Sequence, residues 1–140
     1  MRALNAGVYA KLAAASGLTA LLNGGTASGS ASIYHLRAPD DATLPYVVFS
    51  EQGGGDENQT ANRTKNIVEF IRGYAAGPPS KAAAIDDQID LAMHNTSPSV
   101  SGYTTFWCMR EMDIETVEVT AAGVPVYSDG ATYRIRLDKN

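Results

Sequence analysis

The chain has 140 residues, a formal net charge of -4 and a pI of about 5.0, with 44% hydrophobic and 19% charged residues. This length is typical of one domain, and the composition is that of globular proteins, which excludes disordered, collagen-like and coiled-coil chains. Cys108 is the only cysteine, which excludes an internal disulfide or a multi-cysteine metal site and agrees with folding in a reducing cytoplasm. We therefore expect a single domain over residues 1–140.

The charge pattern limits the partners that the chain can bind. It has no long basic run, so we expect neither the positive surface that drives duplex binding nor sequence-specific recognition of nucleic acid. Near the start, Asn5 and Lys11 interrupt the apolar residues before the core of a signal peptide could form. No membrane association is expected.

The first predicted element is an amphipathic helix over residues 4–15, where large apolar residues recur at the spacing of one helical face. These residues are Leu4, Val8 and Leu12. Gly17 is expected to end this helix. A short apolar turn over residues 18–22 leads into residues 24–32, which are all small and predict a mobile loop.

Strands are predicted where β-branched and aromatic residues gather between turn signals. In the first half of the chain, the predicted strands cover residues 33–36, 46–49 behind Pro45, and 67–74. Alternation along the third strand separates two apolar sets, Val68, Phe70 and Tyr74 on one side and Ile67 and Ile71 on the other. Residues 52–62 hold three glycines and no apolar periodicity, so a mobile loop is predicted near residues 53–62.

A second helix is predicted after Gly77-Pro78-Pro79, with Ser80 as its N-terminal cap. Its apolar stripe consists of Ala82, Ile85, Ile89 and Ala92. Asp86, Asp87 and Asp90 are expected to point mostly to water. The pattern predicts a helix that packs one face on a sheet.

The remaining chain is predicted to form strands joined by turns. These strands cover residues 104–112, 114–119 beyond a bend at Asp113, 124–127 and 132–137. Ala122-Gly123 and Asp129-Gly130 are the turn signals. In the last strand, alternation places Tyr133, Ile135 and Leu137 inward and Arg134 and Arg136 outward.

The order of helix, strands, helix and strands predicts an α+β fold. We expect a mostly antiparallel sheet of about four to five strands, with two α-helices packed on one face. Extended loops are expected near residues 24–32 and 53–62.

No pattern in the sequence indicates a catalytic, cofactor-binding or metal site. Asp56 and Glu57 follow Gly53-Gly54-Gly55 at the point where a phosphate-binding loop needs lysine and a hydroxyl residue. Asp86 and Asp90 lie one helical turn apart, but no nearby histidine or glutamate completes a metal shell, so a solvated helix face is favoured. We expect neither a metal nor a cofactor.

Three other reactive side chains also favour structural roles. His35 and His94 are too far apart in sequence for a helical metal-binding pair, and surface or capping roles are expected for them. Cys108 lies within an apolar segment, which favours a small buried hydrophobic residue over a nucleophile.

The segment around Cys108 also suggests contact with another protein. Strict alternation would place Trp107 and Met109 on the opposite face of the strand from Phe106 and Cys108. A strand that is apolar on both faces is either sandwiched within its own fold or covered by a neighbouring subunit.

Several short motifs follow one another in a fixed order along the chain. They are Tyr9-Ala10-Lys11-Leu12, Gly17-Leu18-Thr19-Ala20-Leu21-Leu22, Leu44-Pro45-Tyr46-Val47-Val48-Phe49, Val68-Glu69-Phe70-Ile71-Arg72-Gly73-Tyr74 before the helix over 81–93, and the closing segment 129–137. With these motifs the chain resembles the tail terminator and tail completion proteins of long-tailed bacteriophages, some of which are described only as small phage domains of unknown function. The resemblance spans nearly the whole chain. The long polar segment over residues 53–62 and the Gly/Ser-rich stretch over residues 24–32 depart from the family pattern.

The resemblance implies a structural virion protein without catalytic residues. Its relatives form hexameric rings at the head-proximal end of the tail tube, stop tube growth and provide the head-tail joining surface. The implied partners are further copies of the chain, the tail tube protein and the head-tail connector proteins, while DNA only passes through the lumen. The protein would be made in the host cytoplasm and reside in the virion at the junction of tail and head.

Contacts between subunits or with neighbouring proteins are expected at five residues, namely Asp56, Glu57, Arg63, Trp107 and Met109. Two alternatives remain open from the sequence. One is another neck, adaptor or morphogenesis protein of a phage, and the other is a small ligand-binding domain or enzyme. An enzyme would gather titratable side chains in one concave site, whereas a ring subunit would bury apolar surface between copies.

Overall fold

The computed structural model describes residues 1–24, 32–58, 61 and 63–140. Its elements are α1 (Arg2–Ala13), α2 (Ser16–Thr19), β1 (Ile33–His35), β2 (Tyr46–Glu57), β3 (Thr64–Ala76), α3 (Pro79–Met93), β4 (Tyr103–Val119) and β5 (Pro125–Lys139). The strands form one sheet in the order β1-β2-β3-β5-β4, in which only the β1–β2 pair is parallel. The predicted α+β fold with a mostly antiparallel sheet is therefore confirmed.

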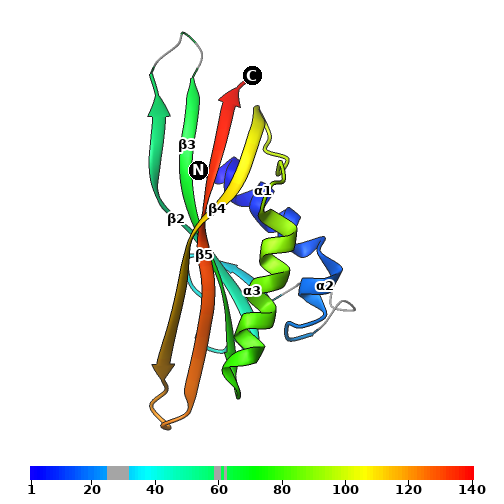
Figure 1. Ribbon diagram of the computed structural model, residues 1–140, viewed down its shortest axis with the longest axis vertical. Helices are drawn as coiled ribbons and strands as arrows, with labels where there is room; N and C mark the ends of the chain where they lie inside the picture. The colour runs from blue at the N-terminus through cyan, green and yellow to red at the C-terminus, as the bar shows by residue number, and fades with distance from the viewer. Residues whose placement is uncertain (25–31, 59–60, 62) are drawn as a thin grey trace.

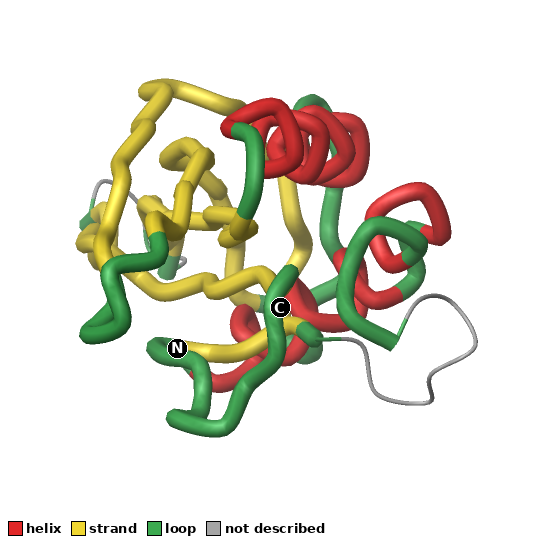
Figure 2. The backbone as a smooth tube through the Cα atoms, turned by 90° about the horizontal axis from the view of Figure 1, so that it is seen from below, coloured by secondary structure: helices red, strands yellow, loops and turns green. Residues whose placement is uncertain are grey.

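The helices pack on one face of the sheet, which we call the inner face, and leave much of the other, the outer face, uncovered (Figure 1). Seen from below, the helices lie to one side of the strands (Figure 2). The long β2–β3 and β4–β5 hairpins extend toward opposite ends of the sheet (Figure 1). None of the helices in the described part of the chain is long and apolar enough to cross a membrane.

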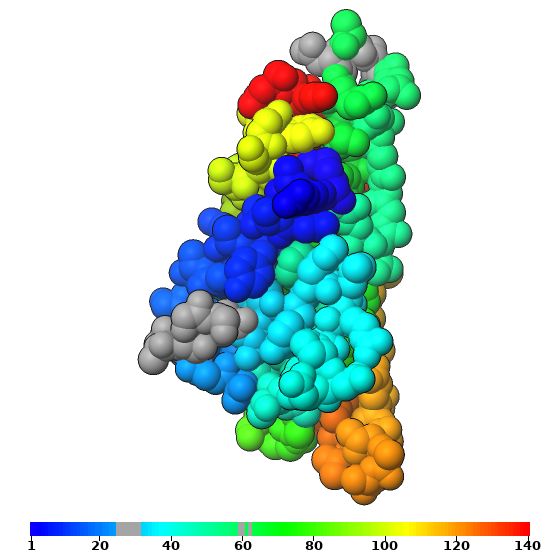
Figure 3. All heavy atoms as spheres, turned by 180° about the vertical axis from the view of Figure 1, so that it is seen from behind, coloured from blue at the N-terminus to red at the C-terminus, as the bar shows by residue number. Residues whose placement is uncertain are grey.

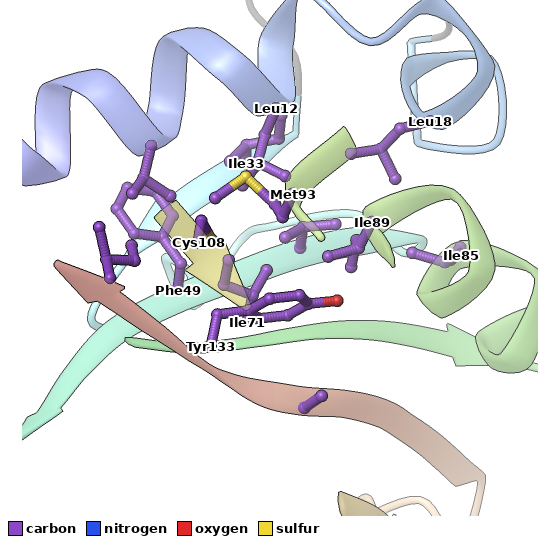
Figure 4. Packing of buried hydrophobic residues seen from close by; sticks show 14 of the residues in the cluster. Leu12, Leu18, Ile33, Phe49, Ile71, Ile85, Ile89, Met93, Cys108 and Tyr133 are labelled. Atoms are coloured by element: carbon purple, nitrogen blue, oxygen red, sulfur yellow. The ribbon is translucent and has the colours of Figure 1, made fainter. Parts of the chain in front are cut away.

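The main core lies between the helices and the inner face of the sheet (Figure 4). Leu12 of α1 lies beside Ile33 of the sheet, whereas Leu18 of α2 lies nearer to Ile89 of α3, and these four side chains are buried. Gly73 lets α3 come close, because a Cβ atom at this position would lie 2.3 Å from Cγ2 of Ile85.

The apolar stripe of α3 agrees with the prediction. Ala82, Ile85 and Ile89 are each at most 1% exposed, and Ala92 packs against the core while half-buried. The predicted cap at Ser80 is wrong, since the helix begins at Pro79 and its N-cap is Pro78, without a side-chain cap bond. Proline at the first helical position fits because that residue has no intrahelical acceptor for an amide hydrogen.

We expect Ile85→Ala and Ile89→Ala each to lower the free energy of unfolding by about 2 to 5 kcal/mol, because truncation of a buried isoleucine leaves a cavity. Asp87→Ala changes an exposed residue of the same helix and is expected to alter stability by less than about 0.5 kcal/mol. Urea unfolding followed by circular dichroism measures all three variants. Equal midpoint shifts for the isoleucine and aspartate variants would contradict the packing of α3.

The prediction that Asp86 points to water is wrong. Asp86 is 7% exposed, and its carboxylate accepts two hydrogen bonds from the guanidinium of Arg110, at 2.9 and 2.7 Å. Arg110 also donates to Asp113 at 2.7 Å and to the hydroxyl of Tyr133 at 3.1 Å. Its side chain therefore links α3, β4 and β5, three elements that no local pattern brings together.

A second buried carboxyl group lies on the inner face. Glu69 is 0% exposed and stands between Glu51 of β2 and Tyr133 of β5 in the register of the sheet. Neither of its carboxyl oxygens has a hydrogen-bond partner among the described residues. Burial, with a smaller contribution from Glu51, raises the pKa of Glu69 to about 8.

Several of the predicted strands are too short. β2 continues to Glu57, so Gly53–Glu57 form a strand paired with β3, in place of the predicted loop. Gly54 has a φ of +111°, and a Cβ atom there would lie 2.2 Å from the carbonyl oxygen of Asn66, which explains why glycine is needed beside β3. Residues 59, 60 and 62 of the predicted loop, and residues 25–31 of the loop predicted over 24–32, lie outside the described residues.

The predicted turn at Asp129-Gly130 is also wrong. Both residues lie inside β5, opposite Gly73 and Arg72 of β3, so the two short strands predicted around them are one strand. The predicted bend at Asp113 is replaced by two bulges, one between Thr105 and Trp107 and one between Arg110 and Met112. The predicted turn at Ala122-Gly123 does join β4 and β5.

The beginning of the chain differs in detail. The first helix ends at Ala13, and Gly17 lies within the separate short helix α2 instead of ending α1. The described residues thus form three helices where two were predicted. Leu36 lies outside β1 with a φ of 70°.

Candidate interaction surface

The outer face of the sheet carries large side chains that the chain's own core leaves exposed. Phe106, Met109 and Met112 are 52%, 38% and 57% exposed, although all three are apolar. Arg134 and Arg136 stand beside them on β5, since Met109 is opposite Arg134 and Trp107 is opposite Arg136. We call the group Phe106, Met109, Met112, Arg72, Arg134 and Arg136 the outer strip.

The bulge at Phe106 accounts for this arrangement. Thr105 is opposite Leu137 and Trp107 is opposite Arg136, so Phe106 is the extra residue and the alternation changes there. The guanidinium of Arg136 lies 5.8 Å from the centre of the Phe106 ring, which places Phe106 on the outer face. Our prediction that Phe106 shares a face with Cys108 is therefore wrong, whereas Cys108 is buried as predicted.

The five predicted contact residues are divided between the two faces. Glu57 forms an ion pair with Arg136 at 3.3 Å, and in this way joins the row that contains Trp107 and Met109. Asp56, one residue earlier in β2, lies on the inner face of the sheet. Its carboxylate pairs with Lys65 at 2.7 Å and with Arg63 at 3.2 Å. The structure thus brings Glu57, Trp107 and Met109 together and places Asp56 and Arg63 separately, on the β2–β3 hairpin.

Electrostatic pairing orders these surface groups. The hydrogen bond from Lys65 holds the pKa of the Asp56 carboxyl below its ordinary value. Arg134 forms a two-point contact with Glu111, whose carboxylate raises the pKa of the guanidinium. These exposed pairs fix the orientation of the side chains more than they stabilise the fold.

An aromatic cluster continues the outer face toward its other end. The ring of Tyr46 contacts those of Tyr34 and Tyr74, with centroid distances of 5.8 and 5.2 Å. Arg72 lies 4.8 Å from the ring centre of Phe70 and 5.2 Å from that of Tyr74. A shallow hollow lies beside these rings and is lined in part by Arg72, Tyr46 and Glu118.

This composition is typical of the buried part of a protein–protein interface, where aromatic residues, methionine and arginine are enriched. The sequence indicated Trp107, Met109 and the outward arginines. It did not indicate Phe106, because the bulge that turns this residue outward leaves no trace in the pattern. Arg72 was missed because it joins the outer strip only through the pairing of β3 with β5, in which it lies opposite Gly130.

The residues considered for metal or catalytic roles are dispersed. His35 packs on the ring of Phe49, with 5.3 Å between ring centres, and the Nδ1 atom of His94 accepts a hydrogen bond from the backbone amide of Arg110 at 3.0 Å. Burial raises the pKa of the Cys108 thiol to about 12. Within the described ranges, no group of three or more histidine, cysteine, aspartate or glutamate residues could hold a metal ion.

Comparison with known proteins gives one family and one fold. The family described as tail completion protein gp17 matches residues 6–139. A chain from the solved structure titled "Virion of native gene transfer agent (GTA) particle" is similar, with a TM-score of 0.72 and 18% identity over 96% of this chain and 94% of that one. At this identity, the likeness shows a shared fold. No curated protein sequence matches the chain.

Proposed function

Because the chain belongs to the tail completion protein gp17 family of structural phage tail proteins, we propose that it forms a hexameric ring at the head-proximal end of the tail tube. In this proposal the ring stops tube growth and provides the surface to which the head is joined. The family match over residues 6–139 carries the proposal. The similar chain from a gene transfer agent virion supports a place in the virion. We propose that this place is the junction of tail and head.

The geometry supports contacts on two sides of each subunit. The outer strip leaves apolar side chains exposed on one face, and the β4–β5 hairpin projects as a separate lobe at one end (Figure 3). These two surfaces differ, and a contact between different surfaces of identical subunits closes into a ring when the rotation between copies is suitable. A specific contact of this kind would bury about 1,200 to 2,000 Å² per pair of neighbours.

The charge of the chain suits a ring through which DNA passes. With a net charge of -4 per subunit, the lumen would be lined by acidic or neutral groups that do not hold the phosphate backbone. The ring would contact the tail tube protein on one side and the head-tail connector proteins on the other. Contacts are proposed at Trp107 and Met109, and at Asp56, Glu57 and Arg63 of the β2–β3 hairpin.

The test is a null mutant of the gene combined with purified protein and tail tubes. We expect the mutant to accumulate tubes of irregular length that do not join heads, because tube growth lacks its stop. Adding the purified protein should produce capped tubes that electron microscopy resolves as carrying one terminal ring. Tubes of normal length that join heads in the absence of the protein would disprove the terminator role and leave another neck or adaptor role in its place.

A further inference from the structure

The β4–β5 hairpin carries an unusual concentration of acidic side chains. Residues 111–133 contain no lysine or arginine, and their acidic residues are Glu111, Asp113, Glu115, Glu118 and Asp129. Glu111 pairs with Arg134, and Asp113 pairs with Arg110. Glu115 is exposed and forms no ion pair with any described residue. We call residues 111–133 the acidic arm.

The acidic arm also exposes apolar side chains. Val117, Val119 and Val124 are 57%, 68% and 48% exposed. Glu115 and Val117 are opposite Asp129 and Tyr127 in β5, on the inner face of the sheet. The inner face of the arm therefore combines valine side chains with the carboxylate of Glu115, which has no ion-pair partner among the described residues.

The outer strip has the complementary character. Its apolar side chains stand among three arginines, of which Arg72 forms no ion pair with a described residue. Arg72 is separated from Ile114 only by Gly130, which has no side chain to fill the space between them. A carboxylate brought to this point would meet a guanidinium that forms no ion pair with a described residue, although Glu118 lines the same hollow.

We infer that the acidic arm of one copy packs on the outer strip of the next copy, with Glu115 facing Arg72 of that copy. This inference rests on the proposed ring and identifies its subunit contact. The two surfaces lie on opposite faces of the same sheet, so one chain cannot close the contact on itself. Both groups of exposed apolar residues become buried in a single contact, and the opposite charges at its edge set the orientation.

A second copy is the occupant that these observations favour. Both halves of the contact are present on this chain, and their charges are opposite, whereas a chain with a net charge of -4 would otherwise repel its own copies. The contact joins unlike surfaces and therefore repeats from copy to copy in one direction. In a ring, every acidic arm and every outer strip would be covered.

The test exchanges the two charges. Glu115→Arg and Arg72→Glu are each expected to weaken association of the protein, alone and on tail tubes, by about tenfold or more, because each places like charges opposite one another. An equimolar mixture of the two variants should regain association. In the mixture, copies can alternate so that the arm of each variant meets the outer strip of the other with opposite charge.

Sedimentation over a range of protein concentrations, with and without purified tail tubes, measures the association. Asp87→Arg and Lys81→Glu reverse charges of the same signs on exposed positions of α3 and should associate like the wild type. Thermal unfolding of each variant confirms that it is folded before its association is compared.

The outcomes separate the contact from the function. Wild-type protein that caps tubes, together with both reversed variants capping equally well, would overturn the contact and leave the terminator role standing. Weakened variants whose mixture fails to recover would also overturn it, and would indicate that these surfaces contact the tube protein. Wild-type protein that associates neither alone nor on tubes would contradict both proposals.

Discussion

Replacing Arg110 with alanine is expected to lower the free energy of unfolding by about 3 to 5 kcal/mol. The side chains of Arg110 and Asp86 are 18% and 9% exposed, and the guanidinium makes a two-point contact with the carboxylate. Without Arg110, the carboxylate of Asp86 stays near the core with no cation to replace its lost hydration. The hydroxyl of Tyr133 loses a donor at the same time.

Chemical denaturation at neutral pH measures this effect, and the double variant Arg110→Met/Asp86→Leu provides the informative comparison. Removal of both charges leaves no unpaired group, so the double variant should recover much of the stability that Arg110→Ala loses. Asp87→Ala, which lies beside Asp86 but faces solvent, should leave the midpoint unchanged. A double variant as unstable as Arg110→Ala would show that packing of the arginine side chain, and not its charge, stabilises this region.

Glu69→Gln is expected to abolish a large pH dependence of stability. The pKa of Glu69 is raised from 4.5 to about 8 in the folded chain, so between these values the unfolded chain releases a proton that the folded chain retains. The stability contributed by the protonated carboxyl is complete below about pH 4.5 and is lost progressively as the pH rises toward 8. The loss is about 1.4 kcal/mol for each pH unit in this window.

Unfolding by urea at pH values from 5 to 9 tests this expectation, with the difference between wild type and Glu69→Gln as the quantity of interest. Relative to the wild type, the free energy of unfolding of the variant should rise steadily up to about pH 8, because the amide of the variant does not ionise. Glu51 and the α-amino group of Met1, which contact each other nearby, are the charged groups that act on Glu69, and both are unchanged in the variant. Glu118→Gln serves as an exposed control. Parallel stability curves for wild type and Glu69→Gln would contradict a raised pKa.

Periodic patterns in the sequence correctly predicted the parts of the fold in which each side chain is either buried in the core or exposed to solvent. The stripe of Ile85 and Ile89 follows from helical spacing, and the alternation of Tyr133, Ile135 and Leu137 with outward arginines follows from strand spacing. Both patterns reflect burial against a single apolar layer. They could be predicted because the core decides the position of every side chain in them.

The predictions that were wrong share a different cause. Gly53–Glu57 and Asp129-Gly130 were predicted as loop and turn from their composition, yet each segment is held in the sheet by strands that are distant in sequence. Backbone hydrogen bonds with a neighbouring strand require no apolar side chain, and glycine at position 130 is needed because a Cβ atom would lie 2.3 Å from the carbonyl oxygen of Ile71. Such close approach is a tertiary property that no local window contains.

The candidate interaction surface was predictable only in part for the same reason. Trp107 and Met109 could be identified as unusual from their own strand. Their neighbours on the outer face, including Arg72, become neighbours only through the pairing of β3, β5 and β4. The buried pair of Asp86 and Arg110 was hidden in a similar way, since its two residues belong to different elements and each alone resembles a surface charge.

The position of β5 between β3 and β4 has a mechanical consequence for the proposed role of joining tail and head. β5 pairs with β3 along residues 126–138 and with β4 along residues 125–139, so both hairpins are hydrogen-bonded to the same strand. The bonds of an antiparallel ladder lie perpendicular to the strands. Tension applied between the two ends of the sheet therefore acts as shear on many backbone bonds at once, instead of opening them one after another. This arrangement lets a subunit with a small core resist pulling along its long axis.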